Sequence, residues 1–328
     1  MKSEKNLYNK LFSHIYVEEE ALKYQNTTEI LSKLKYRNVI LINSMKELTL
    51  RRNQDYKVQK KSPNLILAVR KSDFLTPGED ICNSFNEQNF YYSFPIYNCI
   101  YDCSYCYLQG ISNTAHIIIF VNLSDYFEEI KKITHDNIYI SISNNTDLMP
   151  LENITGYILK WYNFLKKHPE ITVEIRTKST SSEIFNKISP INNMKFVWSL
   201  SPSEVIKEYE LRTPSLENRI RAINKALSMG FSVRLCFEPI LVFKGWCKIY
   251  KNFFEDIKSR IELQKIEKIS LGVFRISKDY FKKLKKQDLN KEIFYANLIE
   301  TQDTLTYEKS ILDKIEEFKE ILLKNNFS

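Results

Sequence analysis

Three cysteines lie close together in one short segment of the sequence, residues 98–109. Cys99, Cys103 and Cys106 are spaced as C-x3-C-x2-C, so a single loop can close three thiols on one metal centre. Thiolates bind zinc or iron–sulfur clusters, whereas three incidental thiols in a turn share no chemistry. Zinc requires a fourth ligand, and the nearest histidine, His116, lies ten residues beyond the last cysteine and begins a predicted strand. A [4Fe–4S] cluster held by three cysteines leaves one iron open to a substrate or cofactor.

The elements that position this segment alternate regularly from about residue 90 onward. Apolar runs rich in β-branched and aromatic residues predict strands, and most are followed by stretches with helical periodicity. The predicted strands are residues 90–96, 116–121, 137–142, 171–177, 194–200, 231–237 and 269–274. The predicted helices are residues 123–133, 151–167, 181–188, 215–228 and 246–262. This alternation predicts an α/β fold with a parallel sheet, and about six repeats favour an open or partial β/α barrel over a three-layer sandwich.

The remaining parts of the chain lie on either side of this region. We divide the sequence into an N-terminal basic α/β extension (1–85), a barrel (86–275) and a C-terminal cap that ends in an amphipathic helix (276–328). Residues 1–75 hold 15 basic and 8 acidic side chains, which is +7 of the net charge of +8. This excess indicates either a nucleic-acid partner or an ordinary solvated basic face. The side chains best suited to an anion are Lys57, Lys60, Lys61, Arg70 and Lys71.

The composition excludes several classes of protein. The chain has only six glycines and neither G-x-x-x-x-G-K-[ST] nor G-x-G-x-x-G, which excludes a glycine-rich phosphate loop. It begins without an apolar signal segment and has no run of 18 uncharged apolar residues, so we expect a soluble, cytoplasmic protein. In a reducing compartment its six cysteines are ligands, catalysts or core residues rather than disulfides. Cys82 and Cys247 show no metal-ligand spacing, and we expect both to be structural.

Polar residues follow several of the predicted strands. In parallel α/β folds, ligands bind at the carboxyl ends of the strands. The positions that meet this condition are residues 98–109, 143–147, 177–178, 199–201 and 238–239. None of these segments identifies a site alone, but their common placement makes them one candidate site.

The cysteine motif also carries a family resemblance. With Tyr105 before the last cysteine, it resembles the signature of the radical S-adenosylmethionine (SAM) superfamily. The run Cys-Ser-Tyr-Cys-Tyr-Leu-Gln (103–109) is similar to the spore photoproduct lyase family, whose members reverse a thymine dimer in spore DNA. Further segments resemble that family in the same order, namely 15–19, 61–70, 120–123, 176–179, 198–201, 212–219 and 238–246. The resemblance covers roughly residues 15–260 and implies a partial (β/α)6 radical SAM barrel.

The resemblance implies two cofactors and a role for each matching residue. Cys99, Cys103 and Cys106 would hold a [4Fe–4S] cluster, and SAM would bind its open iron. The implied SAM contacts are Tyr105 at the adenine, Thr146 and Asp147 near the methionine part, Lys178 at the carboxylate, and Ser199 and Glu238 elsewhere in the pocket. Reductive cleavage of SAM would yield a 5′-deoxyadenosyl radical that abstracts hydrogen from the substrate, with electrons from a donor such as a flavodoxin or ferredoxin.

The sequence departs from the family pattern in two places. Asn144 stands where the lesion-repair enzymes have the cysteine that returns a hydrogen atom to the product. Tyr107 follows the last cysteine as in the family, and Cys236, two residues before Glu238 on a predicted strand, is either a relocated donor or a small core residue. The tail segment 297–307 lacks the basic residues of the family's DNA-opening hairpin, which weakens the case for duplex DNA.

These departures leave three interpretations open. The first is an enzyme that acts on a thymine photoproduct in DNA. The second is a radical SAM enzyme with another substrate, such as a modified nucleotide, RNA or a peptide. The third is a nucleic-acid-binding protein whose cluster is structural.

Overall fold

The chain folds into two compact units, each assembled from several segments. The computed structural model describes residues 12–36, 38–78, 85, 87, 89–134, 137–288, 290–302 and 304–323; Cys82 lies outside them. The first unit comprises Met1–Ile100, Ser112–Thr177 and Glu183–Met194, and the second comprises Tyr101–Ile111, Lys178–Ser182 and Lys195–Ser328. The three-part division at residues 85 and 275 stays a prediction.

The first unit contains a five-stranded sheet of short apolar strands. In sheet order these are β2 (Val39–Ile42), β1 (Ile15–Glu18), β3 (Leu65–Ala68), β8 (Ile117–Phe120) and β6 (Ile96–Tyr97). All neighbours are parallel except β8 and β6. We predicted β8 as one strand of the barrel, but it pairs with β3. An apolar run buried along its whole length, as β8 is, reveals a strand without revealing its neighbour.

The first unit also contains strands that follow the predicted α/β alternation. Their sheet order is β10 (Ile171–Thr177), β9 (Ile138–Ser141), β5 (Phe90–Tyr92) and β4 (Thr76–Pro77), and only the β5–β4 pair is antiparallel. The helix predicted at 151–167 is divided into α7 (Glu152–Thr155) and α8 (Tyr157–Leu165) by Gly156, whose φ of +65° ends a helical turn. The other helices here are η2 (Glu19–Lys23), α2 (Gln25–Ser32), α3 (Lys46–Thr49), α4 (Tyr56–Lys61), α6 (Leu123–Ile130), η3 (Met149–Leu151) and η4 (Glu183–Asn186).

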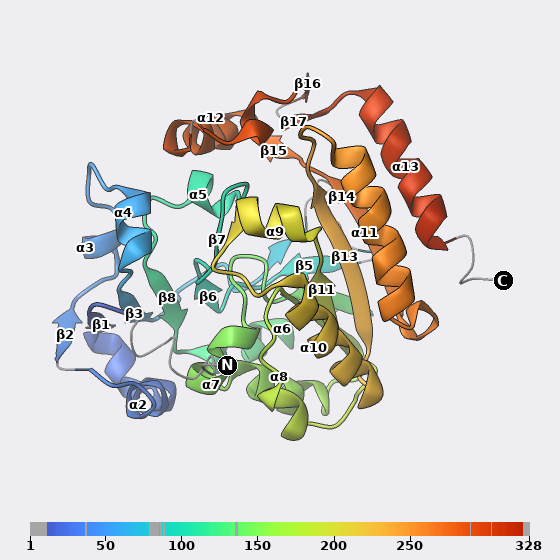
Figure 1. The fold of residues 1–328 in the computed structure, drawn as a ribbon. Helices are drawn as coiled ribbons and strands as arrows, with labels where there is room; N and C mark the ends of the chain where they lie inside the picture. Colours follow the sequence, from blue (N-terminus) through green and yellow to red (C-terminus); the bar gives the residue numbers. More distant parts are fainter. Residues whose placement is uncertain are drawn as a thin grey trace. The chain divides into compact units, whose positions relative to one another are not determined.

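The second unit contains three parallel strands and three long helices. The strands, in order, are β11 (Met194–Ser199, whose first residue belongs to the first unit), β13 (Val233–Ile240) and β14 (Lys268–Val273). The helices α10 (Leu216–Ser228) and α11 (Trp246–Arg260) were both predicted to within two residues at each end. The closing helix α13 (Lys309–Leu323) lies beside α11 in Figure 1, and the Phe318 ring contacts those of Trp246 and Phe254.

Smaller elements of the second unit surround the cysteine segment. Residues 201–213, which were predicted neither as helix nor as strand, contain α9 (Ser203–Tyr209) and β12 (Glu210–Leu211). Strand β12 pairs with β7 (Asp102–Cys103), which carries one of the cysteines. The remaining elements are α5 (Leu108–Ile111), η5 (Leu263–Lys265), β15 (Ile276–Ser277), α12 (Lys278–Gln287), η6 (Glu292–Tyr295), β16 (Leu298–Thr301) and β17 (Thr304–Tyr307).

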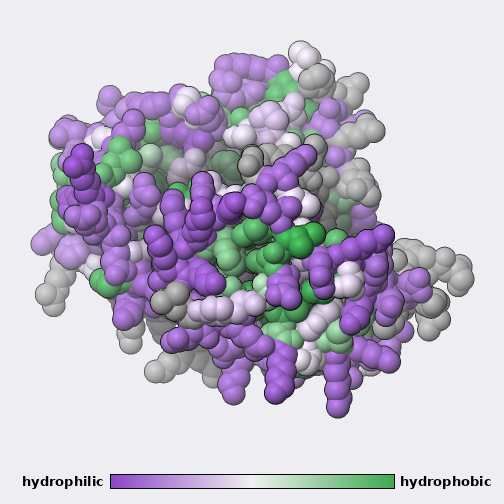
Figure 2. All heavy atoms as spheres, turned by 90° about the horizontal axis from the view of Figure 1, so that it is seen from above, coloured by the Kyte–Doolittle hydropathy of each residue, from purple (hydrophilic) through white to green (hydrophobic). Residues whose placement is uncertain are grey.

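The surface is mainly polar. Hydrophilic side chains dominate the face drawn in Figure 2, with smaller hydrophobic areas between them. Exposed large apolar side chains come from separate elements, as Leu41 of β2, Ile111 of α5 and Ile299 of β16 illustrate. Within the described part of the chain, none of the helices combines the length and the apolar character that a membrane span requires.

Candidate functional site

Two of the three cysteines lie in a loop whose backbone is held by β12. Cys103 of β7 is opposite Glu210 of β12, and the Ser104 N–H donates a hydrogen bond to the Tyr209 carbonyl at 2.8 Å. A two-residue antiparallel pair is short, but it fixes the direction in which the loop leaves β7. The cysteine loop therefore depends on a segment more than a hundred residues further along the chain.

The loop is also closed from within. The Cys103 carbonyl accepts hydrogen bonds from the Cys106 N–H at 3.0 Å and from Gln109 Nε2 at 2.7 Å. Cys103 is buried and Cys106 is half-buried. Tyr107 is half-exposed, and its carbonyl accepts the N–H groups that begin the turn of α5. These bonds hold Cys103 and Cys106 on one turn of chain.

Helix α12 packs against the end of the same loop. Lys283 Nζ donates to the Gly110 carbonyl at 2.9 Å, and Gln287 Nε2 donates to the Gln109 carbonyl at 3.2 Å. A Cβ atom at Gly110 would lie 2.5 Å from Tyr280 Cβ, so only glycine allows the helix this close. Helix α12 therefore braces the end of the cysteine loop through Lys283 and Gln287.

The first cysteine of the motif belongs to the first unit. Cys99 is half-buried, and its carbonyl accepts a hydrogen bond from the ammonium of Lys60, which is itself buried. Lys60 is therefore not part of a basic surface, although we grouped it with surface cations. Lys71, another of that group, forms an exposed ion pair with Glu20, which further reduces the charge available to an anion.

The donor types of the motif fit an iron–sulfur cluster. Across the residues that the structure describes, no three His, Cys, Asp or Glu side chains already form a group that could hold one metal ion. Three thiols on one loop are nevertheless the donors that such clusters take. The hydroxyls of Thr146 and Ser270 are buried without a hydrogen-bond partner, which is uncommon unless a ligand or water supplies one. The residues present therefore fit both a cluster and a polar ligand.

Tyr105, between the second and third cysteines, is joined to a buried carboxylate. Its hydroxyl donates to Glu210 Oε1 at 2.5 Å, and Ser201 Oγ donates to the same oxygen at 2.8 Å. The other oxygen accepts from Arg219 Nη2 at 2.6 Å. Lys178 Nζ lies 3.8 Å from Glu210 Oε1 and 5.9 Å from the centre of the Tyr105 ring. One carboxylate thus gathers two hydroxyls and two cations.

The charges in this group determine its protonation. Burial would raise the pKa of Glu210, but Arg219, Lys178 and the Tyr105 hydrogen bond lower it to about 2. Burial acts to lower the pKa of Lys178, yet Glu210 and the nearby Cys103 hold it above its usual value. Burial raises the pKa of Tyr105 well above its ordinary value, and the Glu210 charge adds to this. At neutral pH, Glu210 is therefore ionised, Lys178 is charged and Tyr105 is neutral.

A row of three small polar residues crosses the parallel strands of the second unit. Ser199 of β11 is in register with Cys236 of β13, and Cys236 is in register with Ser270 of β14. Residues in register on parallel neighbours present their side chains to the same face of the sheet. Cys236 is buried and acts electrostatically on the pKa of Lys178. The structure therefore brings together Ser199, Cys236 and Lys178, which sequence analysis selected separately.

Glu238 lies two residues beyond Cys236 on the same face of β13. A Cβ atom at Gly272 of β14 would lie 2.2 Å from Glu238 Oε1. Glycine at this position therefore leaves the space that the half-buried carboxylate occupies. Sequence analysis missed Gly272, because a single glycine in a predicted strand has many explanations.

Two further predicted residues, Thr146 and Asp147, lie in the first unit. Asp147 is buried, and Thr177 Oγ1 lies 2.8 Å and 2.9 Å from its two carboxylate oxygens. The Met149 N–H also donates to Asp147 at 3.2 Å. Asp147 is thus fixed against the end of β10, while the hydroxyl of Thr146 is buried without a hydrogen-bond partner.

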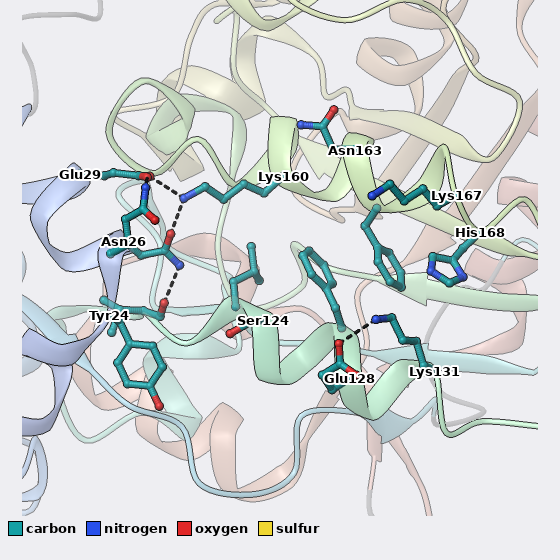
Figure 3. Close-up of a pocket in the computed structure, with 15 residues that line it drawn as sticks. Tyr24, Asn26, Glu29, Ser124, Glu128, Lys131, Lys160, Asn163, Lys167 and His168 are labelled. Carbon is teal, nitrogen blue, oxygen red and sulfur yellow. Dashed lines mark hydrogen bonds and ion pairs between the residues drawn. The ribbon is translucent and has the colours of Figure 1, made fainter.

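The first unit also has an open groove of about 590 Å³ (Figure 3). Lys160 projects into it and binds Glu29 at 2.6 Å and Asn26, while the Phe127 and Phe164 rings stack at 4.4 Å. None of the residues predicted for the site lines this groove. Its size therefore does not mark it as the site of the cysteine chemistry.

Glu210 and Arg219 were not predicted as members of the site, and Ser201 was included only as part of the strand-end segment 199–201. Segments 198–201 and 212–219 stood out for their family resemblance, but nothing in their spacing pairs them with Tyr105. The bond from Tyr105 to Glu210 joins residues 105 positions apart. No local pattern carries that information.

Known proteins similar to this chain agree on one family. The sequence model of the family described as "Spore photoproduct lyase" matches residues 11–306. The spore photoproduct lyase of Clostridium acetobutylicum is 26% identical over 182 residues, which is 54% of this chain and 54% of that protein. That of Bacillus subtilis strain 168 is 20% identical over 260 residues, covering 75% of this chain and 73% of the relative. The chain thus spans about half the length of the first relative and nearly three quarters of the second.

Solved structures show the same fold. A spore photoproduct lyase complexed with dinucleoside spore photoproduct superposes with a TM-score of 0.79 at 17% identity, covering 97% of both chains. A mutant of that enzyme with bound AdoMet and dinucleoside spore photoproduct gives 0.78 at 19% identity, again covering 97% of both chains. This likeness confirms the predicted α/β partial-barrel class.

Proposed function

Because the chain belongs to the spore photoproduct lyase family, we propose that it is a radical SAM enzyme that acts on a thymine photoproduct in DNA. The observation that carries the proposal is the family match over residues 11–306, which contains the whole cysteine loop. The bound AdoMet and dinucleoside photoproduct in similar solved structures support this choice of cofactor and substrate. We further propose that the enzyme is cytoplasmic, where DNA lies. We also propose that it takes its electrons from an external donor of the flavodoxin or ferredoxin kind.

We assign the cofactor-binding roles to the residues that match the family pattern. Cys99, Cys103 and Cys106 hold the [4Fe–4S] cluster. When bound, the cluster and SAM supply reductive cleavage of SAM to a 5′-deoxyadenosyl radical, which abstracts hydrogen from the substrate. The side chains that bind SAM are Tyr105, Thr146, Asp147, Lys178, Ser199 and Glu238. Lys178 is suited to the SAM carboxylate because it is charged and only 15% exposed.

Cys236 is the proposed hydrogen donor in place of the cysteine that Asn144 replaces. An S–H bond gives up a hydrogen atom, which an asparagine side chain does not offer. Cys236 is buried beside Ser199 in the sheet and acts on the pKa of Lys178, so its thiol belongs to the same group of side chains. Tyr107, on the turn that follows Cys106, is the proposed next member of the relay.

The first experiment tests the cluster. Anaerobic reconstitution with iron and sulfide should give about four irons per chain, and Cys103→Ala should abolish iron binding. Cys247→Ala, a half-buried cysteine of α11, is the matched control and should keep the iron. A colourless protein that binds zinc stoichiometrically would refute the proposal.

The second experiment tests the reaction. Reduction with dithionite in the presence of SAM should release 5′-deoxyadenosine, and DNA that contains the photoproduct should yield thymine. Cys236→Ala should keep the release of 5′-deoxyadenosine but lose thymine recovery, whereas Cys247→Ala should keep both. Unchanged thymine recovery in Cys236→Ala would remove Cys236 from the reaction.

A second candidate substrate class is favoured by the C-terminal hairpin. Strands β16 and β17 form an antiparallel pair, but Glu300 of β16 pairs with Lys278 instead of leaving a basic surface. An acidic residue here disfavours contact with duplex phosphates. Release of 5′-deoxyadenosine without repair of the photoproduct would support a modified nucleotide, RNA or a peptide as substrate.

A further inference from the structure

The carboxylate of Glu210 occupies a distinctive place in the second unit. Its backbone pairs with Cys103 across the β12–β7 bridge, and its side chain binds Tyr105 two residues further along the cysteine loop. Glu210 is itself buried. The loop is thus held at two successive points by one residue.

The same carboxylate faces an excess of positive charge. Arg219 is fully buried and donates to Glu210, Thr213 Oγ1 and the carbonyls of Pro214 and Ser199. Its hydrogen bonds tie it firmly in place, so it cannot move toward another anion. The contact of Lys178 is looser, because its Nζ lies 3.8 Å from Glu210 Oε1. Two cations therefore share one buried carboxylate.

Several titratable groups face Lys178. They come from separate elements and are Glu210 of β12, Arg219 of α10, Cys103 of β7 and Cys236 of β13, with the ring of Tyr105 at 5.9 Å. Among the charged groups of the described residues that act on Lys178, Glu210 is the carboxylate. The Lys178 ammonium therefore faces the buried carboxylate of Glu210.

We propose that Glu210 is a positioning residue that fixes Tyr105 on the cysteine loop and holds the Lys178 ammonium in place for the carboxylate of SAM. This inference rests on the proposed function, since it assigns Lys178 a SAM contact. Glu210 acts through Tyr105 and Lys178, and its carboxylate is held by Arg219.

Replacement by glutamine separates these contributions. Glu210→Gln keeps the size of the side chain and an oxygen that accepts from Tyr105, but it removes the negative charge that Arg219 and Lys178 both face. The placement of Lys178 should therefore be lost while the hydrogen bond to Tyr105 is kept.

The test measures the dissociation constants of SAM and of decarboxylated SAM, which lacks the carboxylate, with reconstituted protein by anaerobic equilibrium dialysis. We expect Glu210→Gln to bind SAM about tenfold more weakly than wild type and to bind decarboxylated SAM within about threefold of wild type. Ser201→Ala, which removes one neutral hydrogen bond to the same oxygen, is the control and should stay within about threefold for both ligands. Equal losses for the two ligands in Glu210→Gln, or no loss for SAM, would overturn the inference.

A second variant tests the inference in case Glu210→Gln is too unstable for the binding experiment. Glu210→Gln combined with Lys178→Met restores the original buried net charge, so its midpoint of urea unfolding should exceed that of Glu210→Gln alone. An equal or lower midpoint in the double variant would show that the two residues are not coupled, against the inference. Wild-type protein that binds neither iron nor SAM would instead refute the proposed function, so the two failures are distinguishable.

Discussion

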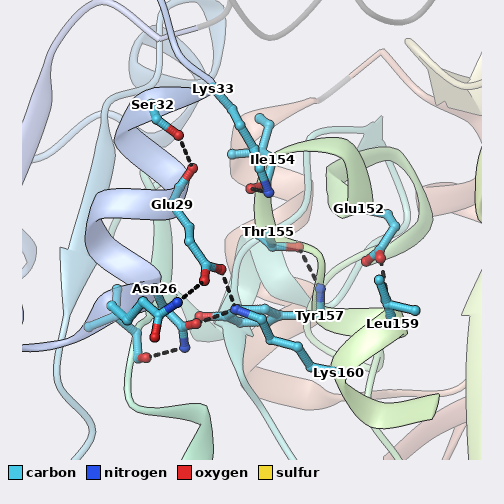
Figure 4. A network of polar contacts seen from close by, with 12 residues as sticks. Asn26, Glu29, Ser32, Lys33, Glu152, Ile154, Thr155, Tyr157, Leu159 and Lys160 are labelled. Atoms are coloured by element: carbon cyan, nitrogen blue, oxygen red, sulfur yellow. Dashed lines mark hydrogen bonds and ion pairs between the residues drawn. The ribbon is translucent and has the colours of Figure 1, made fainter. Parts of the chain in front are cut away.

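Two buried carboxyl groups, Glu210 in the second unit and Glu152 in the first, have pKa values that are shifted in opposite directions. The pKa of Glu210 is lowered to about 2, although burial acts to raise it, because Arg219 and Lys178 lie beside it. Burial raises the pKa of Glu152 to about 7, since its direct partners are the neutral N–H groups of Ile158 and Leu159, at 2.7 Å and 3.1 Å (Figure 4). Backbone donors and the more distant Lys33 and Lys187 only reduce the effect of burial.

The contrast shows how burial can serve structure or chemistry. At Glu152 the carboxyl accepts the N–H groups of the first turn of α8 from outside the N-cap position, which Gly156 occupies. At Glu210 two cations from different elements converge on one carboxylate beside the cysteine loop. A paired, charged and buried group is costly to build, and such groups concentrate at functional sites.

The largest loss of stability is expected when Arg219, the cation that anchors Glu210, is removed. Arg219→Met should lower the free energy of unfolding by about 3–5 kcal/mol, because it leaves a buried carboxylate facing unsatisfied carbonyls. Arg221→Met, on the exposed side of the same helix, should cost under about 1 kcal/mol. Urea unfolding followed by circular dichroism measures both. Equal losses for the two variants would show that the buried pair is not special.

The pH dependence of stability should show the raised pKa of the other carboxyl, Glu152. The folded-state pKa of Glu152, about 7, exceeds the ordinary value of 4.5, so its stabilising contribution is complete below pH 4.5 and is lost as pH rises to 7. This difference corresponds to about 3 kcal/mol. Wild-type protein should therefore lose stability between pH 5 and pH 8, and Glu152→Gln should lose much less. An identical pH profile in the variant would contradict the raised pKa.

Glu210 should show the reverse slope in acid. Its folded-state pKa of about 2 lies below 4.5, so its contribution to stability is present above pH 4.5 and is lost as pH falls toward 2.

Removing the single hydrogen bond from Tyr105 to Glu210 should destabilise the protein less than removing the charge of Arg219. Tyr105→Phe should cost about 1 kcal/mol in urea unfolding at pH 7, with Tyr295→Phe, an exposed tyrosine of η6, as a near-neutral control. A cost as large as that of Arg219→Met would mean that Tyr105, not Arg219, anchors Glu210.

The smallest effect belongs to the groove of the first unit. Lys160→Met breaks a half-exposed ion pair with Glu29 and should cost at most about 1 kcal/mol, while iron content and SAM affinity stay unchanged. Lys167→Met, on the same groove wall, is the control. Loss of SAM affinity in Lys160→Met alone would give the groove a role in cofactor binding.

Much of the fold and part of the site could be predicted from local patterns. The period of apolar residues predicted α10 and α11 closely, and it located β9, β10, β11 and β13. The strand of residues 117–120 was also predicted, but its sheet was not, because β8 is buried along its whole length and shows no polar side. The helix α9 was not predicted, because only seven residues form it.

Sequence alone determined the cysteine spacing, the aromatic between the cysteines and the strand ends where ligands gather, because each is local to a few residues. The tertiary structure decided that β12 holds the cysteine loop, that Lys60 is buried at the Cys99 carbonyl, and that Glu210 joins Tyr105 to Lys178 and Arg219. These contacts link segments far apart along the chain. They depend on which buried charges find a partner when the strands pack, and no local periodicity encodes that choice.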